Sequence, residues 1–168
     1  MRRFFKWFFI IVIGLFILIQ LYPRGAKNDK AAPPEQDIFS KYTAPEQVKS
    51  LVKTSCYDCH SNHTTYPWYH SMQPVAMWLD NHVNEGKREL NFSEFNTYPI
   101  GKQYRKLEAV ADEVDGKDMP LSSYTLIHTN AKLDDSQRSM IVTWANDIRN
   151  QIKASTPADS LLRKPKTS

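Results

Sequence analysis

Cys56-Tyr57-Asp58-Cys59-His60 is the stretch around which the rest of this chain is organised. It has the form C-x-x-C-H, the attachment pattern of a c-type haem. Two thiols one helical turn apart can each bond to a vinyl group of the porphyrin, and the next residue offers an imidazole nitrogen to the iron. The sequence has two cysteines in total, and both lie here. We therefore predict one covalent haem c on Cys56 and Cys59, with His60 as an axial ligand.

Two other chemistries also use a C-x-x-C pair. A thioredoxin-like redox pair follows a buried strand in a βαβ unit, whereas residues 44–54 have the apolar spacing of an amphipathic helix. A zinc site could combine the two cysteines with His63 and His70. The usual Cys₂His₂ spacing leaves about a dozen residues between the two pairs, and that gap is missing. Haem attachment is the favoured interpretation, and the other two remain open.

The net charge is unevenly distributed along the chain. The 168 residues carry +4 overall, but residues 1–30 contribute +5 and residues 153–168 contribute +3. Residues 31–152 therefore carry −4, from 12 basic and 16 acidic side chains. Nucleic-acid binding would need a basic patch on the folded part of the chain. We predict no nucleic-acid partner, and an acidic surface that suits a basic redox partner.

The N-terminus contains an apolar run from Phe4 to Leu21, preceded by Arg2 and Arg3. As a helix this run would be about 27 Å long, close to the hydrocarbon thickness of a bilayer. A cleaved signal peptide is the alternative, but no small-x-small cleavage site follows the run. We predict an uncleaved single-pass anchor over residues 1–22. Because haem is attached covalently outside the cytoplasm, the domain after it is expected in the periplasm or extracytoplasmic space.

The remaining chain has the pattern of one small helical domain. Residues 23–43, rich in Pro, Ala and charged residues, are predicted to be a linker. Residues 44–153 carry apolar side chains at helical spacing, with no convincing strand pattern. Residues 154–168, rich in Ser, Thr, Pro and Lys, are predicted to be a disordered tail. The expected fold class is all-α, with the haem domain behind one transmembrane helix.

Start and stop residues predict where the helices lie. The first helix is expected to begin at Pro45, with Thr43 as its N-cap. A second helix from Pro74 is expected to stop at Gly86, and a third covers residues 101–114. The last helix opens with Asp134 as N-cap, and Gln137 completes a capping box.

The iron of a six-coordinate haem needs a second axial ligand opposite His60. Met119 is the first choice, because it lies in a loop between two helices, and a soft thioether there would favour Fe(II). His128 is the runner-up. His82 is assigned a structural role. Four further residues are disfavoured because they follow His60 closely and would have to reach the opposite face of the ring; they are His63, His70, Met72 and Met77. Among the aromatic residues of the loop that follows His60, we expect Tyr66, Trp68 or Tyr69 to pack against the edge of the cofactor.

Several segments together resemble a known family. They are Cys56 to Asn62, Thr65 to Tyr69, Val83 to Ser93, and Met119-Pro120-Leu121 with Tyr124 and His128. Over residues 40–150 the chain resembles the bacterial haem-binding domain family of exported, membrane-anchored c-type cytochrome-like proteins. The resemblance implies haem c on Cys56 and Cys59, His60 as proximal ligand, and a cytochrome c-like helical fold. His63 and His70 depart from the usual family pattern.

These features favour an electron carrier over an enzyme. A haem with histidine and methionine ligands, held behind a membrane anchor, would pass single electrons to redox partner proteins. The alternative is a haem-based peroxidase, or a redox or gas sensor, with a displaceable distal ligand. A peroxidase needs an acid–base group near bound peroxide, and His128 is the candidate for that group. Haem delivery is a third class, against which covalent attachment argues.

Overall fold

The computed structural model describes residues 1–162 and contains no β-strand within them. The longer helices are α1 (Arg2–Ile19), α3 (Glu46–Ser55), α5 (Val75–Glu89), α6 (Ile100–Asp115) and α8 (Asp135–Ser155). The short helices are α2 (Ile38–Lys41), α4 (Tyr57–His60), α7 (Ser122–Thr125) and α9 (Ala158–Leu161), and the 3-10 turns are η1 (Pro34–Gln36), η2 (Trp68–Ser71), η3 (Phe92–Thr97) and η4 (Thr129–Ala131). The predicted all-α fold class is confirmed.

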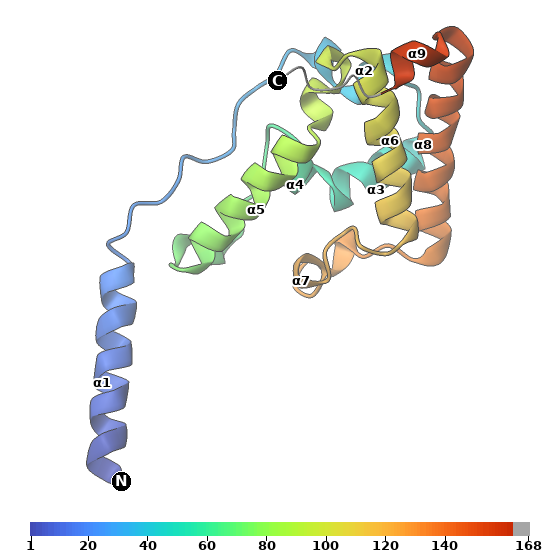
Figure 1. Ribbon diagram of the computed structural model, residues 1–168. Helices are drawn as coiled ribbons and strands as arrows, with labels where there is room; N and C mark the ends of the chain where they lie inside the picture. Colours follow the sequence, from blue (N-terminus) through green and yellow to red (C-terminus); the bar gives the residue numbers. More distant parts are fainter. Residues whose placement is uncertain (163–168) are drawn as a thin grey trace.

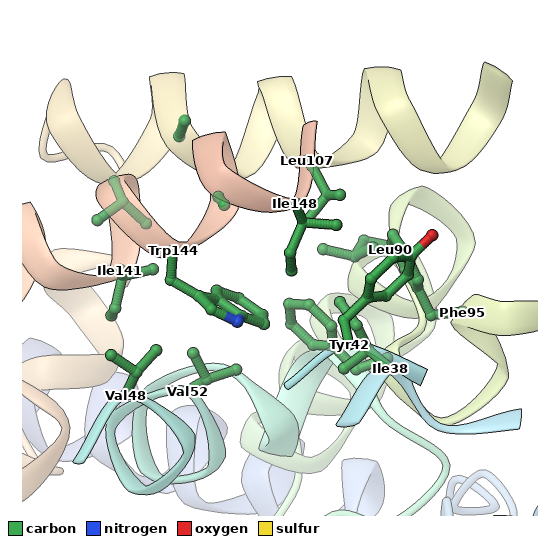
Figure 2. Close-up of a cluster of buried hydrophobic side chains, with 14 of the residues drawn as sticks. Ile38, Tyr42, Val48, Val52, Leu90, Phe95, Leu107, Ile141, Trp144 and Ile148 are labelled. Carbon is green, nitrogen blue, oxygen red and sulfur yellow. The ribbon is translucent and has the colours of Figure 1, made fainter. Parts of the chain in front are cut away.

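The hydrophobic core lies where α6 and α8 pack side by side and α3 meets α8 (Figure 1). Trp144 is buried at its centre and stacks on Phe39, with ring centroids 5.5 Å apart. The apolar residues of α3 and α8 repeat at three- and four-residue spacing, so each helix turns one face inward. Figure 2 shows Val48 and Val52 of α3 below this tryptophan. The core therefore fixes the helix that leads into Cys56.

The starts of two predicted helices differ in how well they match the structure. The capping box of α8 is present: the Asp134 carboxylate accepts from the Gln137 N–H at 2.8 Å, and the Gln137 side chain accepts from the Asp134 N–H at 2.9 Å. Thr43 is not the N-cap of α3. That position is held by Pro45, whose side chain makes no capping bond. The predicted Thr43 cap is therefore wrong.

Gly86 does not end α5, which continues to Glu89. A Cβ on Gly86 would lie 2.6 Å from the Cys59 carbonyl oxygen, closer than any real side chain could approach. The glycine is thus needed because α4 and α5 pack backbone to backbone at this point. The predicted stop at Gly86 is corrected to a close contact between two helices.

The predicted linker over residues 23–43 is largely part of the folded domain. Ile38 and Tyr42 are in the core, and Asn28 is buried. The Lys30 N–H donates to the Asn62 carbonyl, and the Thr64 N–H donates to the Asn28 carbonyl, both at 3.0 Å. These backbone hydrogen bonds to residues 62–64 hold residues 28–30 in place. The prolines of the segment lie in or beside short turns. The domain therefore begins before residue 44.

The predicted disordered tail also begins too early. Helix α8 continues to Ser155, and α9 follows after Pro157. Leu161 is buried against the core, and its carbonyl accepts from the Arg105 guanidinium at 2.9 Å. The burial of Leu161 and its hydrogen bond from Arg105 thus order the segment up to residue 162. Residues 163–168, the rest of the predicted tail, lie outside the described residues.

Helix α1 projects away from the domain and exposes its apolar side chains (Figure 1). It ends at Ile19 rather than Leu21, and its 18 residues include Arg2, Arg3 and Lys6. None of the helices described for residues 1–162 is both long enough and apolar enough to cross a membrane. The membrane-spanning helix predicted from the sequence is therefore not confirmed.

Trp144→Ala should lower the free energy of unfolding by about 3–5 kcal/mol, because it removes a large buried side chain at the centre of the core. Trp68→Ala is the matched control: this tryptophan is 78% exposed, and its loss should change stability by less than about 0.5 kcal/mol. Chemical denaturation of both variants measures the difference. Equal losses would contradict the described core.

Candidate haem site

The two cysteines and His60 lie at the junction of α3 and α4. Cys56 ends α3 and precedes α4, and its carbonyl accepts from the N–H groups of Cys59 at 3.2 Å and His60 at 2.9 Å. These bonds form one tight helical turn. Helix α4 packs mainly against α5, and it also contacts η3. The fold therefore presents both thiols and the imidazole from one short, fixed turn.

The orientation of the His60 ring is set by two backbone carbonyls. Its Nδ1 lies 2.9 Å from the Gly86 oxygen and 3.1 Å from the Leu90 oxygen. Carbonyl oxygens only accept hydrogen bonds, so Nδ1 carries the proton and Nε2 keeps a free lone pair. Burial lowers the pKa of His60, and the two carbonyl bonds oppose this only in part. The ring is thus a neutral imidazole with a fixed tautomer, the form in which a histidine can bind a metal.

Both thiols are held in their protonated form. Burial, and then the neighbouring Cys59, raise the pKa of Cys56 to about 12. Burial, and then the charge of Asp58, raise the pKa of Cys59 to about 11. Redox-active C-x-x-C pairs instead have a lowered pKa that favours the thiolate. Together with the absence of strands in residues 1–162, these shifts disfavour the thioredoxin-like interpretation.

Three adjoining cavities surround this turn. The first, of about 350 Å³, is bounded by α4, α5 and the loop after α6, and its lining includes Cys56, Cys59, His60 and Met119. The second, of about 230 Å³, continues towards α6 and is also lined by Cys56, His60 and Met119. The third, of about 280 Å³, opens beside Cys59 towards Tyr69 and Trp78. The first cavity is within the range of about 300–1,000 Å³ that is typical of ligand-binding sites, and the other two are smaller and adjoin it.

Met119 is held in the cavity wall by its own backbone. Helix α6 ends with Lys117 in the left-handed conformation, at φ 65°, and the N–H groups of Asp118 and Met119 both donate to the Glu113 carbonyl at 3.0 Å. This arrangement is a helix-terminating motif of the Schellman type. The Arg138 guanidinium donates to the Met119 carbonyl at 2.7 Å and to the Val114 carbonyl at 2.8 Å. The backbone of Met119, the predicted distal ligand, is thus held by the end of α6 on one side and by Arg138 of α8 on the other.

A side-chain hydrogen bond ties α7, just after Met119, to the cysteine turn. The Tyr124 hydroxyl donates to the Asp58 carboxylate at 2.7 Å, and the other Asp58 oxygen accepts from the Thr65 N–H at 3.0 Å. Burial, and then this bond to Asp58, raise the pKa of Tyr124, so its hydroxyl stays a donor. Asp58 and Tyr124 thus hold the opposite walls of the cavity together.

A family model described as a haem-binding domain matches residues 14–147. The chain belongs to the haem-binding domain family. No curated protein and no solved structure matches it.

The residues of this haem-binding domain fit a haem at the three cavities. Two protonated thiols, one imidazole with a free Nε2 and one thioether line the same space. Apolar groups make up most of the wall further from the iron ligands; they are Leu90, Phe92, Ala109, Val110, Val114 and Leu121. A mostly apolar lining with a few placed polar groups is what a large flat cofactor needs.

His128 is less well placed than Met119. Its Nε2 lies 2.7 Å from the Tyr69 hydroxyl, and its ring stacks on Tyr124. It lines a cavity of about 10 Å³ with Cys59, but not the two cavities that His60 lines. The runner-up ligand is thus engaged elsewhere.

His82, to which the sequence assigned a structural role, does line the largest of the three cavities. Its Nδ1 lies 2.8 Å from the Trp78 carbonyl, so Nε2 has a free lone pair. No local pattern marked this position, because His82 is far from Cys56, Cys59 and His60 along the chain and only the fold brings it to their cavity. It is a second candidate for the distal side.

Tyr66 and Trp68 are not brought to the cysteine turn. The Tyr66 hydroxyl accepts from the Asn28 N–H at 2.9 Å, and its ring packs on His70. Trp68 points outward and is exposed. Pro67, with its extended backbone, sends the two side chains to other faces. Neither residue lines the three cavities, so the structure does not support the predicted contact of either with the cofactor edge, whereas Tyr69 does line the cavity beside Cys59.

The zinc alternative has no support in the structure. His63 pairs with Asp29, and His70 pairs with Asp80, both at 2.8 Å. Within residues 1–162, no group of three or more His, Cys, Asp and Glu side chains is arranged to hold a metal ion. His63 therefore pairs with the N-terminal segment, and His70 pairs with α5.

The family-like segment around Asn91 supports His60 from the other side. The Asn91 side chain caps η3 by accepting from the Ser93 N–H at 3.0 Å, and it donates to buried Asn62 at 2.7 Å. Phe92 is buried, stacks on Tyr57 and meets the His60 ring edge-on. This packing fixes the turn in which Leu90 offers its carbonyl to His60.

Gly86→Ala should lower the free energy of unfolding by about 1–3 kcal/mol, because the added Cβ forces α5 away from the Cys59 carbonyl. It should also reduce the fraction of protein purified with haem, since His60 loses its partner on α5. Gly14→Ala in α1, where a Cβ meets nothing within 4 Å, is the control. Wild-type stability and haem content in Gly86→Ala would contradict the close contact.

Tyr124→Phe should increase amide hydrogen exchange in residues 119–128, because the loop loses its bond to the Asp58 carboxylate. A hydrogen bond to a charged group contributes about 1.5–3 kcal/mol. Tyr42→Phe is the matched control, since the Tyr42 hydroxyl donates to buried Gln103 at 2.6 Å, away from the cavities. It should lower global stability and leave the exchange of residues 119–128 unchanged. Similar exchange of residues 119–128 in the two variants would contradict the role of the Tyr124–Asp58 hydrogen bond.

Proposed function

We propose that this haem-binding domain carries one covalent haem c and works as a cytochrome c-like electron carrier. Cys56 and Cys59 would hold the porphyrin, and His60 Nε2 and the Met119 sulfur would bind its iron. When bound, the haem supplies reversible one-electron chemistry. The observation that carries the proposal is that His60 and Met119 line the same two cavities beside Cys56.

The cysteines suit thioether formation. In each attachment the thiol adds across a vinyl group: a sulfur–carbon bond forms, and the thiol proton ends on the neighbouring carbon. This step moves no electrons to or from an external partner. It starts from a protonated thiol, the form in which burial keeps Cys56 and Cys59. One helical turn between the two sulfurs places both on the same side of α4.

The ligands suit electron transfer more than catalysis. Burial favours the neutral form of His60 and two carbonyls fix the orientation of its ring, while Glu113 and Arg138 hold the Met119 backbone. A haem iron bound by two residues held in this way would offer no position to a substrate and would need little rearrangement when its charge changes. A thioether on the distal side also stabilises Fe(II) and raises the reduction potential.

A second candidate function follows from the position of His82. If Met119 leaves the iron, an imidazole with a free Nε2 lines the same cavity. A histidine near bound peroxide could act as an acid–base group, as a peroxidase needs, or it could replace the methionine in a redox sensor. This alternative requires a displaceable distal ligand.

The proposed location is the outer face of the cytoplasmic membrane, with basic redox proteins as partners. Two features support it: α1 exposes a continuous apolar surface, and Glu85, Glu89 and Glu113 line the cavities. Acidic side chains near the haem would steer a basic partner to it.

Met119→Ala should abolish the weak far-red absorption band of methionine-ligated ferric haem c, lower the reduction potential and let carbon monoxide bind the ferrous protein. Met77→Ala, an exposed methionine outside the cavities lined by His60, is the control. A spectrum unchanged in Met119→Ala would reject this ligand. If His82→Ala changed the spectrum instead, or if the wild type turned over peroxide, the alternative function would hold.

A further inference from the structure

The exposed large apolar side chains of the domain gather on one side. In the described part of the chain after Tyr22 they are Trp68, Met77, Trp78, Leu126, Ile127 and Leu162. The first five belong to three neighbouring segments: η2, the start of α5, and the residues that follow α7. We call these five side chains the apolar collar. Soluble surfaces rarely group such residues without a partner.

Two members of the collar border one opening, because Trp78 and Ile127 line the same cavity, the one beside Cys59. Trp68 packs edge-on against Tyr69, and the Tyr69 hydroxyl is 2.7 Å from His128, next to Ile127. Met77 and Leu126 are the chain neighbours of Trp78 and Ile127. The collar therefore lies beside the cavity next to Cys59.

The collar lies beside the end of α1. The Gln20 side chain donates to the Gln73 carbonyl and accepts from the Gln73 N–H, both at 3.0 Å. Gln73 is buried and directly precedes the start of α5. In Figure 1 the start of α5 and α7 both lie at the lower side of the domain, from which α1 projects. The apolar surface of α1 and the collar thus adjoin through this pair of hydrogen bonds.

Basic residues follow the apolar surface of α1 along the chain. Arg24 and Lys27 are both exposed. Gly25 between them packs against Asp80 of α5, where a Cβ would lie 3.0 Å from the carboxylate. Tryptophan, leucine and isoleucine beside basic residues are typical of surfaces that lie in the interface of a bilayer. A docking site for a soluble basic protein would instead present acidic groups.

We propose that the apolar collar rests on a lipid bilayer, with Leu126, Ile127 and the two tryptophans in its interface. The inference builds on the proposed membrane location and adds that the haem domain itself lies against the lipid, so α1 is not a free tether. The cavity beside Cys59 then faces the membrane, while the glutamate-lined side near α6 remains open to partners.

The test uses the full-length, haem-loaded protein in vesicles of phosphatidylcholine and phosphatidylglycerol that contain a phosphatidylcholine with a photoreactive acyl chain. Adducts are mapped by mass spectrometry after illumination. We expect adducts on α1 and on the peptides that carry residues 68–78 and 121–131. Leu126→Glu should reduce the adducts on 121–131 severalfold and leave those on α1 unchanged. Leu162→Glu, an exposed leucine outside the collar, should change neither.

The outcomes separate this inference from the proposed function. Adducts on α1 alone would overturn the inference and leave the membrane location standing. Adducts on no peptide would overturn both the membrane location and the inference. Collar peptides that resist labelling, and become protected from hydrogen exchange only when a redox protein is added, would assign the collar to a protein partner and overturn the lipid contact. The haem spectrum, recorded on the same samples, reports separately on the electron-carrier proposal.

Discussion

The site depends on one contact between two helices, the approach of α4 to α5 at Gly86. A glycine there lets the Cys59 carbonyl lie against the α5 backbone. This closeness brings the carbonyls of Gly86 and Leu90 within reach of His60 Nδ1. Since a carbonyl can only accept, the contact decides which imidazole nitrogen is free for iron. The close packing of α4 on α5 thus sets the tautomer of His60.

The loop that carries Met119 is positioned in a different way. Met119 lies on a loop, and loops are positioned by their ends and by the groups that satisfy their backbone. Here the end of α6 fixes the Met119 N–H, Arg138 of α8 fixes its carbonyl, and Tyr124 ties the next helix to Asp58. Asp58, which accepts the Tyr124 hydrogen bond, lies between the two cysteines in the sequence. The turn that holds the thiols also anchors the opposite wall.

The local part of this architecture was predictable from the sequence, and the long-range part was not. The cysteine turn, the capping box at Asp134 and the helical spacing of the core depend on neighbouring residues, and the sequence predicted all three. Glycine is common at helix ends, so the sequence predicted a stop at Gly86. Only its contact with Cys59, which joins residues distant in sequence, explains why a glycine lies inside α5. Arg138 bonds to carbonyls 19 and 24 residues away, and His82 lines a cavity with residues distant in sequence, so no local pattern marks either of them. The sequence also could not show that Tyr66 bonds to Asn28 and packs on His70, because these partners are set by the fold.

The central claim is that Cys56 and Cys59 are the covalent attachment points of a haem whose iron His60 binds. Its most direct measurement is the intact mass of the full chain, purified from cells that carry a haem-attachment system and treated with an alkylating reagent after unfolding. The account predicts a mass increased by one haem, no alkylated cysteine, and a coloured peptide that contains residues 56–60. A colourless protein of unmodified mass, with both thiols alkylated, would contradict it.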